Sequence, residues 1–261
     1  MSQRNAIAAT VVLSLAALAP LSALAQDAPA PAGWTGSGEL GLALARGNSR
    51  SENLNAKLAF GYEDDDWTHA LSASGLRAKG ETTGDFDGDG VEETRYSTSA
   101  NRYDLGASSA WRIDPRRHLS ATLRYENDDF SAFEYQATAA IGYGYRFVDN
   151  ERTRLLGEIG PGYRRARDAA TGATESNAII RGQLDLRHRL TANTELVDTL
   201  LVESGKDNTF LQNDLGVAVA MNERFALKAG LQTRHNTDVD ETAGVKKTDT
   251  LTTVNLVYNF R

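Results

Sequence analysis

The C-terminal stretch Thr248–Phe260, TDTLTTVNLVYNF, decides the fold. Because side chains alternate along an extended strand, every second residue shares a face. One face is apolar and the other is mostly polar. The apolar face carries Val254, Leu256, Tyr258 and Phe260, and the other carries Asp249, Thr253, Asn255, Val257 and Asn259. Such a strand closes an outer-membrane barrel or ends a soluble antiparallel sheet, so the remaining sequence must distinguish them.

The composition restricts the class of protein. The mean hydropathy of -0.43 excludes a helical membrane protein, whereas a transmembrane barrel can be this polar because only alternate residues meet lipid. The net charge of -7 argues against nucleic acid as a partner. The absence of cysteine excludes disulfides and thiolate metal sites.

The N-terminus has the features of an export signal. Arg4 precedes an uncharged run over residues 6–19, and Ala23-Leu24-Ala25 forms an A-x-A cleavage site. We predict that residues 1–25 are a removed signal peptide, with an uncleaved anchor helix as the alternative. Residues 26–32 read as a Pro/Ala linker, which leaves 33–261 as the exported barrel domain.

From Gly33 onward, alternating runs are separated by turn residues, which predicts strands throughout. The expected strands are about 34–45, 52–63, 67–79, 96–113, 118–127, 133–147, 153–167, 175–190, 195–205, 209–221, 225–236 and 248–260. The 67–79 strand alternates too poorly for its faces to be assigned. The 133–147 strand alternates most clearly, with aromatics at both ends of one face and small aliphatics between, as in a membrane strand. That face carries Phe133, Tyr135, Ala137, Ala139, Ile141, Tyr143, Tyr145 and Phe147.

The number and spacing of the strands favour an all-β, antiparallel up-and-down transmembrane barrel. About twelve strands is an even number, as single-chain bacterial barrels require. The connections after even-numbered strands are tight, while those after the third, seventh and eleventh are long. Short periplasmic turns and longer external loops produce this pattern when both chain ends lie in the periplasm.

Several segments resemble one known family. They are 33–41 (GWTGSGELG), Gly47-Asn48, 143–146 (YGYR), 160–164 (GPGYR), 201–205 (LVESG) and 256–260 (LVYNF). In this order they are similar to the salt-induced outer membrane proteins (YdiY-like), a domain family of unknown function. The resemblance implies a porin-like barrel in the Gram-negative cell outer membrane but no activity. Arg261 after the terminal aromatic and a longer acidic insertion at 85–93 depart from the family pattern.

The acidic insertion is the sharpest local motif. Its sequence, DFDGDGVEE over residues 85–93, matches the start of an EF-hand-type calcium loop. The expected metal ligands are Asp85, Asp87, Asp89, the Val91 carbonyl and Glu93. Position 12 would be Tyr96 rather than the usual glutamate, and no helices flank the loop. A possible Ca²⁺ site and a solvated acidic loop tip therefore both remain open.

The face expected to point into the lumen is rich in charge. Its predicted lining residues are Glu39, Lys57, Arg102, Arg112, Arg124, Arg146, Glu158, Arg164, Arg181, Asp185, Arg187 and Lys228, and Asp104 and Glu126 share the same face. One interpretation is a salt-bridged plug. The other is a constriction that favours small anions, since arginine outnumbers acid in this set.

We expect no enzyme, because none of the histidines lies in a recognisable nucleophile motif. The alternative is a lipid-acting, phospholipase-like enzyme that uses Ser204, Glu203 and His235 near the outer rim. The preferred function is a narrow channel or structural envelope protein, linked to salt or osmotic stress through the family resemblance alone. The expected partners are outer-membrane lipids, the barrel-assembly machinery through the C-terminal strand, and small ions or solutes.

Overall fold

The computed structural model describes residues 33–45, 51–239 and 246–260. The expected signal peptide (1–25) and linker (26–32) lie outside the described residues. Among the described residues, no helix is both long and apolar enough to cross a membrane.

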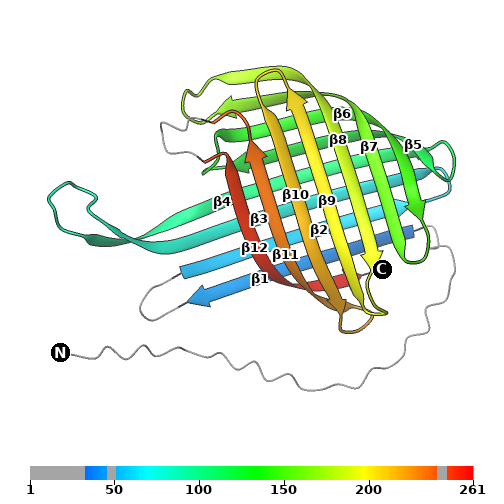
Figure 1. Cartoon of the computed structure of the whole chain (residues 1–261), viewed down its shortest axis with the longest axis horizontal. Coiled ribbons are helices and arrows are strands. Elements are labelled where there is room, and N and C mark those ends of the chain that lie inside the picture. Colours follow the sequence, from blue (N-terminus) through cyan, green and yellow to red (C-terminus); the bar gives the residue numbers. More distant parts are fainter. Residues whose placement is uncertain (1–32, 46–50, 240–245, 261) are drawn as a thin grey trace. The chain divides into compact units, whose positions relative to one another are not determined.

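Antiparallel strands form one closed ring, in which each strand pairs with its neighbours in the sequence and β1 pairs with β12 (Figure 1). The strands are β1 Gly33–Ala45, β2 Ser51–Glu63, β3 Trp67–Gly84, β4 Glu93–Arg112, β5 Arg117–Asp128, β6 Phe133–Asp149, β7 Thr153–Asp168, β8 Thr174–Arg189, β9 Thr194–Gly205, β10 Thr209–Ala220, β11 Phe225–Asn236 and β12 Thr248–Phe260. This confirms the predicted twelve-strand antiparallel barrel. β3 and β4 extend past the ring as a long hairpin (Figure 1).

The tight turns at one end of the barrel share a local hydrogen-bonding pattern. Asp64, Asp114, Asn150 and Asn222 each begin a turn, and each side-chain oxygen accepts the backbone N–H groups two and three residues later. Asp and Asn favour such turns because their short side chains mimic a backbone acceptor. The same chemistry therefore fixes four of the connections that follow even-numbered strands.

The apolar face of each strand points away from the lumen. On β12, Val254 is 63% exposed and Leu256 is 47% exposed, whereas Asn255 and Val257, which alternate with them, are buried. This confirms the alternation expected for the closing strand. Aromatic side chains also contact one another across strands on the outside. Tyr125 of β5 lies 6.1 Å from Tyr103 and 6.2 Å from Tyr135, measured between ring centroids.

Phe133 is an exception to the predicted outward face of β6, and the prediction for this residue was wrong. Its side chain is only 2% exposed, and the Arg164 guanidinium lies 5.5 Å from the centre of its ring. The pairing of β6 with β7 shifts register between Phe133 and Tyr135. A register irregularity of this kind reverses the face of the residues beyond it, so Phe133 turns inward while Tyr135 stays outside.

The ring closes through a short seam between β1 and β12. The paired residues run only from Gly36–Phe260 to Leu40–Leu256. A Cβ atom on Gly36 would lie 2.1 Å from the Phe260 ring, so that ring packs directly over the glycine backbone. The Phe260 ring also contacts Phe60 of β2, with a centroid distance of 5.5 Å. The terminal aromatic thus covers the seam and joins it to the neighbouring strand.

Substitution of Gly160 on β7 tests whether β6 and β7 must pack closely at this position. A Cβ atom there would lie 1.9 Å from the Ile141 carbonyl oxygen, which is backbone and cannot rotate away. We expect Gly160→Ala to lower the free energy of unfolding by about 1–3 kcal/mol. Gly182→Ala on β8 is the control, because a Cβ atom there meets nothing within 4 Å. Urea unfolding of the refolded variants measures both changes, and equal losses would contradict this packing argument.

Candidate functional site in the barrel interior

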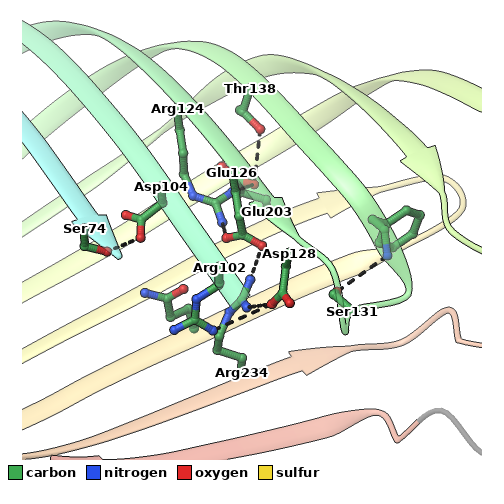
Figure 2. A network of polar contacts seen from close by, with 12 residues as sticks. Ser74, Arg102, Asp104, Arg124, Glu126, Asp128, Ser131, Thr138, Glu203 and Arg234 are labelled. Carbon is green, nitrogen blue, oxygen red and sulfur yellow. Dashed lines mark hydrogen bonds and ion pairs between the residues drawn. The ribbon is translucent and has the colours of Figure 1, made fainter. Parts of the chain in front are cut away.

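Ion pairs cross the lumen from one wall to the opposite one. Arg234 on β11 donates from Nη1 to Asp128 Oδ2 on β5 over 3.0 Å, and its Nη2 donates to Glu126. β11 and β5 are six places apart in the ring of twelve, so these contacts span its full width (Figure 2). The side chains of Arg234 and Glu126 are each only 4% exposed. At this level, buried side chains join opposite walls of the barrel.

A second bridge joins the same network to β9. Arg124 donates to Glu126 Oε2 over 2.7 Å and to Glu203 Oε2 over 3.3 Å. Thr138 on β6 also donates to Glu203, again over 3.3 Å. Glu203 is fully buried, so its charge is compensated inside the barrel rather than by bulk water.

Phe210 lies at the centre of this network. Its side chain is fully buried, and the guanidinium carbons of Arg124 and Arg234 lie 4.7 and 5.2 Å from its ring centroid. Both distances suit cation–π attraction, which strengthens when the cation is removed from water. Sequence reasoning assigned Phe210 no role, although the alternation of β10 places it on the inward face opposite Leu211. An aromatic residue on an otherwise polar inward face was the available signal.

Smaller clusters continue the network along the barrel. Arg181 donates to Glu158 over 3.0 Å, and the His118 ring lies 3.3 Å from the same carboxylate. On another part of the wall, Lys228 donates to Glu39 over 2.9 Å. These contacts join different strands, so they fasten neighbouring parts of the ring together.

The predicted lining residues fall into two groups. Those that lie inside the barrel, in hydrogen bonds, buried positions or cavity walls, are Glu39, Lys57, Arg102, Arg124, Glu158, Arg164, Arg181, Asp185 and Lys228. Arg112, Arg146 and Arg187 instead lie near the strand ends. They contact acids close to the turns, namely Glu63, Asp149 and Glu195. Their position beside the turns explains why they do not join the central network.

The expected excess of arginine over acid does not hold for the central interior. The prediction omitted the inward carboxylates Asp128, Glu203 and Asp214, as well as Arg234. Asp214 accepts hydrogen bonds from Gln212 and Gln232 over 2.7 and 2.6 Å. With these acids included, the central interior has no clear surplus of positive charge.

Two small polar cavities remain beside the network. One of about 140 Å³ is lined by Glu39, Lys57, Asp104 and Lys228 among others. The second, of about 220 Å³, is lined by Ser99, Asp128, Arg234 and Asp249 among others. Arg102 and Gln232 line both cavities, and Arg102 donates to the Gln232 amide oxygen. This contact between β4 and β11 therefore lies where the two cavities meet.

The acidic loop brings together three of its five predicted metal ligands. Carboxylate oxygens of Asp85, Asp87 and Asp89 all lie within 4.8 Å of one another, and all three residues are exposed. Glu93 instead contacts Arg95 over 2.8 Å, while the Val91 N–H donates to Asp89. The N–H groups of Gly90 and Gly88 donate to Asp85, which holds the pKa of its carboxyl below the usual value.

Gly88 and Gly90 give the acidic loop its tight shape. Their φ angles are +79° and +83°, in the left-handed region that favours glycine. This conformation lets the intervening acids return toward one another. The loop backbone thus preorganises the three carboxylates.

The residues of the alternative hydrolase do not meet. Glu203 is fully buried inside the barrel, whereas the next residue, Ser204, points to the opposite face and lies 3.0 Å from the Thr209 hydroxyl. The His235 ring bonds Thr248 over 2.8 Å, and its strand is separated from β9 by β10. Successive residues on one strand cannot serve the same site from opposite faces.

Arg234 tests whether the cross-lumen network stabilises the barrel. We expect Arg234→Ala to cost about 3–5 kcal/mol of unfolding free energy, because two buried carboxylates lose their shared cation. Arg187→Ala is the control: its side chain is 65% exposed and its loss should cost at most about 1 kcal/mol. Denaturant titration of both variants in the same lipid measures these losses of unfolding free energy. A loss for Arg234→Ala no larger than the loss for Arg187→Ala would argue against a stabilising role for the network.

Comparisons with known proteins place the chain in a family. It is 24% identical to the "Uncharacterized protein YdiY" of Escherichia coli (strain K12), over 99% of this chain and all of that protein.

Two solved structures are also similar in fold. The match to the NanC porin structure covers 87% of this chain and 97% of the NanC chain, at 9% identity and a TM-score of 0.47. The COG4313 outer membrane channel from Pseudomonas putida F1 covers 92% and 99%, at 11% identity and the same TM-score. Structural likenesses this distant carry no inference about activity. The family model described as "Protein of unknown function, DUF481" matches residues 38–260, and the chain therefore belongs to that family.

Proposed function

We propose that the chain is an outer-membrane barrel whose lumen is closed by its own ion-pair network. It acts as a structural envelope protein or as a narrow channel that passes at most small ions when the network loosens. The observation that carries this proposal is the contact of Arg234 with Glu126 and Asp128 across the full width of the ring. Buried, paired side chains leave a solute no continuous water-filled path at that level.

The outer surface supports the membrane location. Leu123, Ile141 and Val254 are each more than 60% exposed, on three different strands. A water-soluble monomer rarely leaves such an apolar surface uncovered. Trp111 and Tyr103 are eight residues apart on β4, or about 27 Å along the strand at roughly 3.4 Å per residue. Allowing for strand tilt, this separation is close to the height of the apolar band between aromatic girdles, about 25 Å.

The cellular context is part of the same proposal. Residues 1–25 would direct export, outer-membrane lipids would surround the apolar face, and the barrel-assembly machinery would read the strand that ends at Phe260. A role in salt or osmotic stress is supported by the family resemblance alone. The hydrolase alternative is not proposed, because Ser204, Glu203 and His235 do not form a site.

Planar-bilayer recording tests the closed lumen. The unmodified barrel should show very small or rare conductance steps at neutral pH. Arg234→Ala should open larger steps, because it removes the cation that joins opposite walls. Arg187→Ala, at the rim, should behave like the unmodified protein. Large, persistent conductance of the unmodified barrel that is insensitive to Arg234→Ala would overturn the proposal.

We also propose weak calcium binding at the loop formed by residues 85–93, supported by the close approach of its three aspartates. Calorimetric titration of the refolded barrel should give a dissociation constant of about 10⁻⁴–10⁻³ M, typical of weak extracellular sites. Asp87→Asn should abolish the signal. Glu93→Gln should retain it, because Glu93 contacts Arg95 rather than the aspartates. If titration of the unmodified protein with calcium gives no heat, the loop is a solvated acidic tip and not a calcium site.

A further inference from the structure

A polar pair lies on the outer wall, where apolar side chains would be expected. Asn213 Nδ2 on β10 donates to Asp198 Oδ1 on β9 over 2.7 Å. Each residue is the fifth of twelve in its strand, so both lie near the middle of the wall rather than at a rim. Their same-face neighbours along these strands are apolar: Leu196, Leu200, Leu211 and Leu215.

The neighbouring residues show that this pair faces outward. Thr199 donates to Asp185 inside the barrel over 2.9 Å, so the preceding residue, Asp198, points to the outside. On β10, Gln212 donates to Asp214 inside the barrel over 2.7 Å, so Asn213 between them points outward as well. The cross-strand pairing of Leu215 with Asp198 places an exposed leucine directly beside the carboxylate.

A carboxylate at this position is costly in lipid. Ionisable side chains within the hydrocarbon region usually face protein or water, because lipid offers no hydrogen-bonding partner. The Asn213 amide satisfies one oxygen of Asp198. An asparagine amide has a second N–H and a carbonyl oxygen, and a carboxylate has a second oxygen, so the pair presents one donor and two acceptor oxygens to whatever covers it.

We propose that this face, formed by β9 and β10, is where a second copy of the chain docks within the membrane. A two-fold axis beside the pair would place Asn213 of each copy against Asp198 of the other, so that the free donor and acceptor meet. Two-fold interfaces require such a self-complementary patch. Hydrogen bonds between membrane-embedded surfaces stabilise association. This association is independent of whether the lumen conducts.

An adjoining apolar groove gives the second copy a place to pack. A groove of about 430 Å³ is lined by Phe147, Ile159, Leu184, Leu200 and Val202 among others, on β6 to β9. Leu200 borders both this groove and the polar pair, since its cross-strand partner is Asn213. A ridge of leucine side chains from β10 of the second copy would fit beside the polar contact and into this groove.

Cysteine cross-linking tests the interface, because the chain contains no cysteine of its own. Leu215→Cys places a single thiol beside Asp198, close to the proposed axis. Leu123→Cys places one on β5, where the side chain is 61% exposed. In liposomes at low protein density, mild oxidation should link Leu215→Cys into dimers and leave Leu123→Cys monomeric. Dimers of both variants, or of neither, would overturn the proposal.

A second measurement separates a specific contact from random collision. Sedimentation equilibrium in detergent should give the mass of two chains for the unmodified protein. The Asp198→Leu, Asn213→Leu double variant should give the mass of one and should no longer cross-link through Leu215→Cys. A double variant that remains dimeric would contradict the role of the polar pair. A monomeric unmodified protein, or recovery from native membranes only with a different protein, would exclude a second copy as the occupant.

Discussion

The barrel depends on the requirement that every backbone N–H and C=O in a membrane be paired within the protein. A ring of strands meets this requirement only if it closes, because an open sheet edge exposes unpaired groups to lipid. Here closure rests on the short β1–β12 seam, where the Phe260 ring lies directly over Gly36. Once the ring closes, strand alternation determines the rest: apolar side chains face outward and charged ones are forced into a narrow interior.

The narrow interior explains why its buried positive and negative side chains are paired with one another. A buried ion pair is a poor source of stability compared with apolar packing, but removing one partner leaves a costly unpaired charge. Arg234, Glu126 and Asp128 are therefore mutually dependent, and Phe210 adds an aromatic surface to two of the cations in the network. The same groups that make the interior polar also join its opposite walls.

Local patterns were enough to predict the strands, the twelve-strand ring and the apolar outer face, because alternation and turn residues are short-range signals. The inward turn of Phe133 was missed because a register irregularity leaves no clear mark in the sequence. The cross-lumen partners were also missed. Arg234 and Asp128 are 106 positions apart and meet only after the ring has closed. The hydrolase alternative, by contrast, overlooked a signal that the sequence carried: alternation along one strand puts the side chains of Glu203 and Ser204 on opposite faces of the barrel wall.

The most direct test of the account asks whether lipid covers the apolar face. All three tryptophans, Trp34, Trp67 and Trp111, are exposed on the outside of the barrel. In vesicles whose acyl chains carry bromine near the headgroup, tryptophan fluorescence should be strongly quenched, and aqueous iodide should have little effect. A protein that stays monodisperse in detergent-free buffer, with its tryptophans quenched by iodide and not by brominated lipid, would contradict the account.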